Sequence, residues 1–409
     1  MAYLMGIDLG TSSLKVIIID DQGNLKVQTA QGYRFDSPEV GFAEQDVSVW
    51  WQACCNAVRQ AVELLGAPAS EIKAVSFSGQ MHGAVLLDSE LQPVRPAILH
   101  CDARSAQQVA EMKAALGEDL IRSVVLNPIY TGFLLPSLLW VRDREPHNYQ
   151  RTRHAFLPKD YLKFKLSGRL TSDYSDASAT LAFDIKRGTW SQEILDRVQV
   201  PAEILPECGG TTEAVGCVTK EAAEATGLAE GTIVVNGGGD QIMQAIGAGA
   251  VNPGMATVNI GSSGQVCFQC DGPIVNPKLN TNTFFGYDRD RWITMGATMT
   301  AGLSLAWFNS LFGKTDYEQL NREVANIRPG SGGLIFLPYL NGERTPHVNP
   351  NLRGLFLGMN PETTRYQMAR AVMEGVAFSL RECLELCWDL GLTASELLAP
   401  GGGARSAHW

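Results

Sequence analysis

Short apolar runs alternate with amphipathic stretches along the chain, and this alternation predicts a mixed α/β protein. Residues 3–7 and 14–19 are apolar and flank a polar, glycine-containing turn, which is typical of a β-hairpin. Residues 47–66 carry apolar side chains at helical spacing, and residues 72–78 form a short apolar run typical of a buried strand. Strand and helix patterns keep alternating along the chain, so we expect sheets covered by helices.

The strand, turn, strand pattern of residues 3–19 returns in residues 255–269. The first turn, Asp8-Leu9-Gly10-Thr11-Ser12, and the second, Gly261-Ser262-Ser263-Gly264, both combine glycine with hydroxyl groups. An ordinary hairpin turn explains such a sequence. Alternatively, the amides and hydroxyls hold a phosphate while Asp8 faces its Mg²⁺. Lys15 then either adds positive charge or is simply solvated. The echo predicts two related halves whose hairpins face each other across a cleft.

Asp240 is the candidate for acid–base chemistry. It follows an apolar run, residues 232–235, and the glycines Gly237-Gly238-Gly239, and it precedes a small-residue helix. Glycine lets the backbone approach a ligand closely. Asp240 is therefore either an ordinary helix N-cap or a general base at the mouth of a cleft, and a helix N-terminus suits both roles.

Two further stretches carry candidate ligand contacts. His82 lies in Gln80-Met81-His82-Gly83, between two strand patterns, and loops at strand ends often carry function. Asp102 is expected to cap a helix over residues 103–116, and together with Arg104 it can hold sugar hydroxyls. The polar residues 172–178 predict a loop.

The last part of the sequence predicts a long helix over residues 361–390, with Pro361 in its first turn. A strand over residues 396–399 then leads into Gly401-Gly402-Gly403-Ala404. Several glycines at a strand end allow close approach of a nucleotide. The sequence stops at Trp409, where a further helix is expected, so we expect the second domain to be C-terminally incomplete.

Composition limits the number of domains, the partners and the location. The 409 residues predict two domains, which we place at residues 1–248 and 249–409. The net charge of −10 argues against nucleic acid or an anionic membrane surface as a partner. No apolar run approaches the ~20 residues of a membrane span. Nine scattered cysteines without a signal-peptide pattern indicate a reducing, cytoplasmic location.

In this order, the motifs resemble those of the FGGY family of carbohydrate kinases, over essentially the whole chain. The similar segments are Gly6-Ile7-Asp8-Leu9-Gly10-Thr11-Ser12, Gly261-Ser262-Ser263-Gly264, Gly342-Glu343-Arg344-Thr345-Pro346, residues 354–374 and Gly401-Gly402-Gly403-Ala404-Arg405-Ser406. The resemblance implies the α/β, two-domain actin, hexokinase and Hsp70-like ATPase fold, which is ribonuclease H-like and has a central inter-domain cleft. It implies a sugar-binding first domain and a nucleotide-binding second domain that the family extends further.

The resemblance also implies a reaction and a site. Gln80-Met81-His82-Gly83 is similar to the sugar-binding motif of members that phosphorylate D-xylulose to D-xylulose 5-phosphate with ATP and Mg²⁺. Asp240 matches the family's catalytic aspartate, and Asp8 matches the acid near the phosphates and the metal. The implied sugar contacts are Met81, His82, Asp102, Arg104 and Gln241. The implied ATP contacts are Gly10, Thr11, Ser12, Lys15, Gly261, Ser262, Ser263, Gly402, Gly403 and Ala404.

Some positions depart from the family pattern on the sugar side. Gln241 stands where Asn is common, and His100-Cys101 precede Asp102 where Trp-Asn is usual. Ribulose and gluconate are therefore alternative substrates, and a non-catalytic, sugar-binding fragment is an alternative of another class. The expected partners are a small sugar and ATP; a homodimer is one option, and the oligomeric state stays open.

Overall fold

The computed structural model describes residues 2–409, whose contacts define two compact units. Unit 1 contains the chain up to Val125, Ile129–Met243 and Phe284–Arg291. Unit 2 contains Leu126–Pro128, Gln244–Thr283 and Trp292–Trp409. Two short segments therefore belong to a different unit from the residues that flank them in sequence.

The central sheet of unit 1 has the strand order β13-β14-β5-β1-β2-β3, with β15 also paired to β5. β1 runs antiparallel to β2, β2 antiparallel to β3, and β1 parallel to β5. β14 and β15 also run parallel to β5. These strands are β1 (Tyr3–Leu9), β2 (Ser13–Asp20), β3 (Leu25–Gly32), β5 (Ile72–Gly79), β13 (Ala214–Cys217), β14 (Ile233–Val235) and β15 (Gly238–Gly239).

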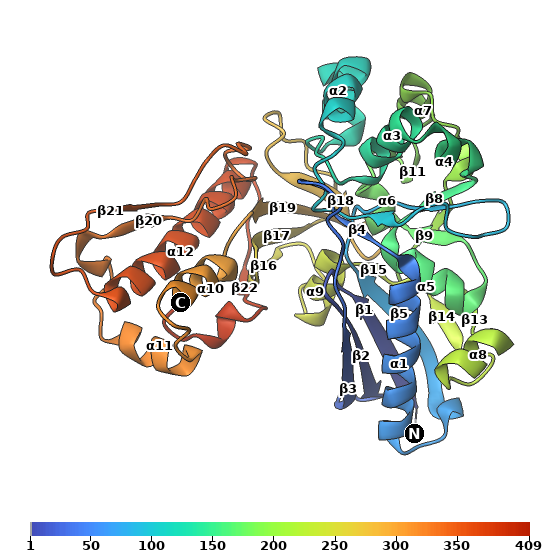
Figure 1. Cartoon of the computed structure of the whole chain (residues 1–409), viewed down its shortest axis with the longest axis horizontal. Helices are drawn as coiled ribbons and strands as arrows, with labels where there is room; N and C mark the ends of the chain where they lie inside the picture. Colours follow the sequence, from blue (N-terminus) through green and yellow to red (C-terminus); the bar gives the residue numbers. More distant parts are fainter. Residues whose placement is uncertain (1) are drawn as a thin grey trace. The chain divides into compact units, whose positions relative to one another are not determined.

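Two helices pack against this sheet, α1 (Val47–Leu65) and α5 (Pro158–Ser167), and α8 (Lys220–Thr226) packs against both of these helices (Figure 1). Asp46 caps α1 by accepting a hydrogen bond from the Ser48 amide, and Gly66 ends it with φ 65°. Every second residue of β2 is buried, so its apolar face joins α1 and α5 in one core.

The rest of unit 1 consists of small helices and two-stranded sheets. The helices are α2 (Ala106–Leu120), a π-helical turn (Ile121–Val125), α3 (Leu134–Arg144), α4 (Pro146–Arg151), α6 (Tyr174–Ser178) and α7 (Gln192–Val198). The strands are β4 (Glu44–Gln45), β6 (Val85–Leu87), β7 (Ala97–Ile98), β8 (His154–Phe156), β9 (Thr171–Asp173), β10 (Phe183–Asp184), β11 (Thr189–Trp190) and β12 (Glu207–Gly209).

Two of the expected elements in unit 1 are wrong. Residues 172–178 do not form an exposed loop: they are the end of β9 and the whole of α6, and all of them are buried. The helix expected from residue 103 begins at Ala106 and has a non-helical residue at Gly117.

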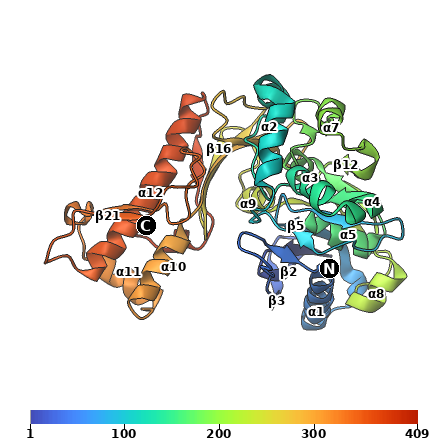
Figure 2. The same cartoon turned by 45° about the horizontal axis from the view of Figure 1, so that its top comes forward.

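The sheet of unit 2 has the order β18-β19-β17-β16-β22. Its strands are β16 (Met255–Ile260), β17 (Gly264–Cys270), β18 (Asn282–Phe285), β19 (Trp292–Thr298) and β22 (Glu396–Leu398). The long helix α12 (Arg365–Asp389) packs against β17 and β19, beside α10 (Gly302–Leu311) and α11 (Tyr317–Ala325) (Figure 2). Thr364 begins α12 with a capping box, so Pro361 lies before the helix and not in its first turn.

The two central sheets repeat one arrangement. The order β5-β1-β2-β3 in unit 1 corresponds to β22-β16-β17-β19 in unit 2. In each, the hairpin strands are antiparallel and the neighbour of the first hairpin strand is parallel to it. The weak sequence echo between residues 3–19 and 255–269 is therefore a structural repeat. None of the helices within residues 2–409 has the length and apolar character that crossing a membrane requires.

Candidate active site

Three chain segments reach the same edge of the unit 1 sheet. Asp8 of β1 pairs with Ser78 of β5, and Gly239 of β15 pairs with Gly79 of β5. All three strands are parallel, so their carboxyl ends lie together, which is where open α/β sheets bind ligands. Asp8, the loop after Gly79 and Asp240 are neighbours for this reason.

The turn after β1 is tied to the loop after β5. The Gly10 amide donates to Ser13 O at 3.0 Å and closes the turn. The Thr11 hydroxyl donates to Gln80 Oε1 at 3.2 Å. Asp8 accepts a hydrogen bond from Ser78 Oγ at 3.0 Å, and its second oxygen lies 3.7 Å from Lys15 Nζ. The Asp8 side chain is still 38% exposed, so it can meet a ligand.

The glycines before Asp240 are required by close packing. Gly237 has φ 72°, and a Cβ there would lie 2.1 Å from Phe77 O. A Cβ on Gly239 would lie 2.8 Å from Cγ and Sδ of Met81. The buried Met81 side chain therefore packs directly on the backbone that leads to Asp240.

Asp240 is the first residue of α9 (Asp240–Gly247). Desolvation, reinforced by the nearby charge of Asp8, raises the pKa of Asp240 to about 6. Gln241 Nε2 donates to Asp240 Oδ1 at 3.3 Å and opposes that rise. A carboxylate of this kind is ionised at neutral pH but more basic than an ordinary aspartate, which suits a general base.

His82 is held in one orientation. Its backbone has φ 74°, a left-handed conformation that is uncommon for a residue with a side chain. Its Nδ1 lies 3.0 Å from Ala179 O, and because a carbonyl only accepts, Nδ1 carries the proton. The ring stacks on Phe133 with centroids 3.9 Å apart. Backbone strain in such a setting is typical of a functional position.

Asp102 and Arg104 belong to a buried ion network. Asp102 accepts hydrogen bonds from the amides of Ala43 at 2.6 Å and Arg104 at 2.8 Å, and it pairs with the Arg104 guanidinium. Arg104 also pairs with Glu44 and stacks on Phe42 at 3.8 Å. Asp102 is therefore not the helix cap that we expected, because α2 begins four residues later and these partners occupy the carboxylate. Contact of this pair with sugar stays a prediction.

Hydrogen bonds from the start of α10 hold the turn at residues 261–264 in unit 2. Ser262 O accepts from the amides of Ala301 at 2.9 Å and Leu303 at 3.1 Å. The Gly302 amide donates to Gly261 O at 2.8 Å, and a Cβ on Gly302 would lie 2.6 Å from that oxygen. Ser263 Oγ accepts from Gln265 Nε2 at 2.6 Å. These hydrogen bonds thus hold the turn in one defined conformation.

The glycine turn after β22 lies against β16. A Cβ on Gly401, whose φ is 94°, would lie 2.1 Å from Asn259 Oδ1, and one on Gly403 would lie 2.4 Å from Ile260 Cγ2. Gly402 and Ala404 are exposed in the same turn. The expected nucleotide contacts of unit 2 therefore come from two adjacent turns, at the ends of β16 and β22.

The sequence reasoning missed a buried charged cluster in unit 1. Within the described residues 2–409, the group of acidic, cysteine and histidine side chains close enough to share a metal ion is Asp160, Asp173 and Asp176. Lys159 Nζ lies between them and takes the place of a cation. The available signal was the pair of lysines Lys159 and Lys163, spaced one helical turn apart on α5 with Asp160 between them.

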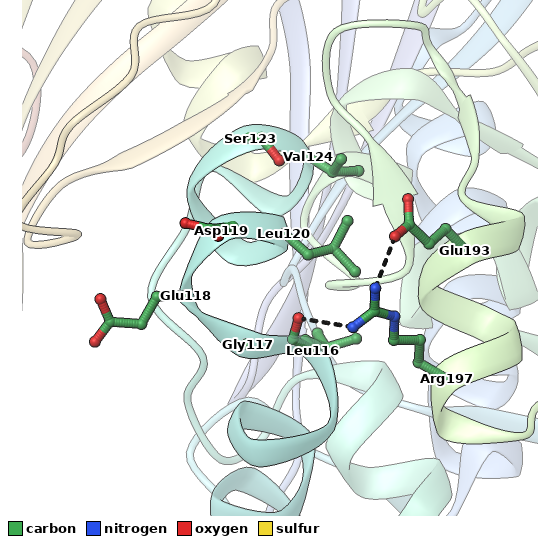
Figure 3. Close-up of a pocket in the computed structure, with 9 residues that line it drawn as sticks. All are labelled: Leu116, Gly117, Glu118, Asp119, Leu120, Ser123, Val124, Glu193 and Arg197. Atoms are coloured by element: carbon green, nitrogen blue, oxygen red, sulfur yellow. Dashed lines mark hydrogen bonds and ion pairs between the residues drawn. The ribbon is translucent and has the colours of Figure 1, made fainter.

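A surface pocket lies at the break in α2, and its residues are distant in sequence from the ends of β1, β5 and β15. Figure 3 shows Arg197 reaching across it to Leu116 O at 3.4 Å and to Glu193 at 3.1 Å. Its lining contains none of the expected site residues.

The repeated hairpin with its parallel neighbour, ending in glycine-rich turns, defines the actin-like ATPase fold of two-domain sugar kinases. Residues 3–247 match the N-terminal domain, and residues 256–409 the C-terminal domain, of the FGGY family of carbohydrate kinases. The chain belongs to this family, whose members use ATP.

Individual relatives agree with the family match. The chain is 37% identical over 410 residues to a protein named xylulose kinase from Bacillus subtilis (strain 168), covering 100% of this chain and 82% of that one. The solved structure of a protein named xyloylose kinase, from Brucella ovis, matches with a TM-score of 0.91 at 35% identity, and the match covers 100% of this chain and 83% of that chain. A gluconate kinase structure from Lactobacillus acidophilus also has a TM-score of 0.91, at 26% identity, covering 99% of this chain and 82% of that chain.

Proposed function

We propose that this carbohydrate kinase transfers the γ-phosphoryl group of ATP to D-xylulose and forms D-xylulose 5-phosphate. The observation that supports this most is the pairing of Gly239 with Gly79, together with the packing of Met81 on Gly239. A basic carboxylate thereby adjoins the Met81-His82 loop. Relatives named xylulose kinase that are 37% identical over essentially the whole chain support the choice of sugar.

In this proposal Asp240 accepts the proton of the sugar's terminal hydroxyl. The oxygen attacks the γ-phosphorus, and the bond to the departing ADP oxygen breaks with its electron pair. The proposed sugar contacts are Met81, His82, Gln241, Asp102 and Arg104. Phosphoryl transfer mainly requires positioning, charge stabilisation and a base, and the braced turns suit positioning because they cannot easily move.

The ATP contacts are proposed at both turns. In unit 1 they are Gly10, Thr11, Ser12 and Lys15. In unit 2 they are Gly261, Ser262, Ser263, Gly402, Gly403 and Ala404. Amides and hydroxyls at such turns suit phosphate oxygens, and glycines permit close approach.

Mg²⁺ is the proposed metal, with Asp8 facing it. The Asp8 carboxylate fits a hard cation, because one oxygen accepts a single hydrogen bond from Ser78 and the side chain is partly exposed. When bound, Mg²⁺ would neutralise charge on the phosphates. A cytoplasmic location is proposed on the nine free cysteines, and a homodimer is one candidate assembly.

A panel of acceptors tests the substrate. The purified chain should release ADP with D-xylulose at a higher kcat/KM than with D-ribulose, D-gluconate or glycerol. Equal or greater kcat/KM with gluconate would reassign the sugar, and sugar binding by calorimetry without any turnover would indicate a non-catalytic protein.

His82→Ala should raise the KM for the sugar by about 10- to 100-fold, the range expected when one or two hydrogen bonds are lost. The KM for ATP should change less than about threefold, because His82 is fixed on the sugar side by Ala179 and Phe133. His147→Ala, which removes an exposed histidine on α4, is the control. A similar increase in both KM values would mean that His82 is structural.

A further inference from the structure

A cluster of five charged side chains is buried beneath the backbone that carries Asp240. We call it the Lys–Asp cluster; its members are Lys159, Asp160, Lys163, Asp173 and Asp176, each at most 1% exposed. Burial of one unpaired charge is strongly unfavourable, so five such groups need mutual pairing. Nothing in the proposed reaction uses them directly.

The members of the cluster pair with one another. Lys159 Nζ lies 2.7 Å from Asp160, 2.5 Å from Asp173 and 3.1 Å from Asp176. Lys163 Nζ lies 3.0 Å from Asp160. Burial, reinforced by the neighbouring acids, raises the pKa of Asp176 well above its usual value. The Lys159 ammonium lies among the three carboxyl groups and occupies the position that a metal ion would need.

Ser175 connects this cluster to the Asp240 backbone. Asp173 Oδ1 accepts hydrogen bonds from the Ser175 amide, at 2.9 Å, and from the Ser175 hydroxyl. Because that hydroxyl gives its proton to Asp173, its lone pairs are available, and it accepts from the Gly239 amide at 3.1 Å. The contact is one residue away from Asp240.

The other end of the glycine segment is attached to the same cluster. Lys163 Nζ lies 2.5 Å from Asn236 Oδ1, and the Asn236 side chain donates to Gly210 O at 3.1 Å. A Cβ on Gly79 would lie 2.8 Å from Lys159 Cβ, so the cluster also packs against β5. Glycines are the most flexible residues in a chain. Residues 237–239 are nevertheless fixed, because buried groups hold this segment at both ends.

We propose that Ser175 is a positioning residue for catalysis: its hydroxyl, aligned by Asp173 and Lys159, holds the Gly239 amide and so sets the position of the Asp240 carboxylate. This inference rests on the proposed role of Asp240 as the base. A displaced base reacts slowly even when the substrate binds normally, because a misplacement of about 1 Å can lower the rate roughly 10²-fold.

Ser175→Ala tests the proposal, with Ser178→Ala as a matched control. Ser178 is also buried in α6, and its hydroxyl also accepts from a backbone amide, that of Phe285 at 3.1 Å. The Ser178 hydroxyl donates to Ser175 O at 2.7 Å, so this control loses a contact with the Ser175 backbone but keeps the Ser175 hydroxyl and its bonds to Asp173 and Gly239. Both substitutions remove one buried hydroxyl bonded to an amide, so both should lower the melting temperature similarly. Only Ser175→Ala should lower kcat, by about 10- to 100-fold, with the sugar KM changed less than threefold; Ser178→Ala should keep kcat within about twofold.

Equal kcat values for the two variants would overturn the positioning role of Ser175. If Asp240→Asn is inactive in the same experiment, only the role of Ser175 is wrong, and Asp240 remains the proposed base. If Asp240→Asn is active, both the proposed base and this inference are wrong. Should Ser175→Ala not fold, Ser175→Cys provides a group of similar size with a weaker acceptor. It should show a smaller loss of kcat, and an unchanged kcat would count against the proposal.

Discussion

Asp240→Asn should lower kcat about 10²–10⁴-fold, the usual contribution of a general base, while the protein remains folded. The amide has nearly the same shape as the carboxyl group but cannot accept the hydroxyl proton. Initial rates of ADP release with D-xylulose measure the effect, and circular dichroism checks the fold. A variant with near-full activity would remove Asp240 from the base role.

The same substitution should make the protein more stable at neutral pH. The pKa of Asp240 is raised to about 6 in the folded state, against 3.8 for the ordinary side chain. Protonated Asp240 therefore favours the folded state below pH 4, and this contribution is lost as the pH rises through 6. Asparagine carries no such charge, so Asp240→Asn should add up to ~3 kcal/mol at pH 7–8 and almost nothing at pH 3.5.

The acid side of the activity profile provides an independent check on Asp240. At limiting concentrations of both substrates, kcat/KM of the unmodified protein should fall tenfold per pH unit below about pH 6, as the base becomes protonated. Gln241→Ala removes a hydrogen bond that lowers the pKa of Asp240. That variant should move the fall to higher pH, and a shift to lower pH would contradict the assignment.

Local patterns predicted the parts of the fold that local chemistry determines. Residues 3–7 and 14–19 alternate or run apolar because β1 and β2 bury one face in the core, and the observed hairpin follows from this. The turn at Gly10–Ser12 and the glycines before Asp240 were also readable, since close backbone approach requires glycine. Family membership, both halves of the fold and kinase activity could thus be inferred from sequence motifs.

Contacts between segments that are distant in the sequence could not be predicted from the sequence pattern in the same way. Residues 172–178 are as polar as a surface loop, yet Asp173 and Asp176 are fully buried. Their burial is possible only because Lys159, from another helix, neutralises them. Asp102 was mistaken for a helix cap for a similar reason, since its carboxylate accepts from the amide of Ala43, which is distant in the sequence. A hydropathy pattern carries no information about such partners.

Lys159→Met should be the most destabilising substitution proposed for unit 1, with a loss of about 3–5 kcal/mol at pH 7.5. Burial alone would lower the pKa of Lys159, but Asp160, Asp173 and Asp176 outweigh it and hold that pKa well above its usual value. Methionine fills a similar volume and leaves the three acids without their cation. Thermal unfolding should show a melting temperature lower by roughly 10 °C, since 1 kcal/mol corresponds to about 2–4 °C for a domain of this size.

The pH dependence of that loss separates lost charge pairing from lost packing. Burial alone would raise the pKa of Asp160, but Lys159 and Lys163 outweigh it and lower that pKa. Ionised Asp160 therefore stabilises the folded state above pH 4, and this contribution is lost as the pH falls. The unmodified protein loses this contribution in acid and Lys159→Met has already lost it, so the two melting temperatures should converge below pH 4. Lys165→Met, a partly exposed position on the same helix, should change stability by less than about 1 kcal/mol. If Lys159→Met were as stable as this control at pH 7.5, the three acids would have to be neutral in the native protein. The ion pair between Lys159 and Asp173 would then not exist, and it could not align the Ser175 hydroxyl.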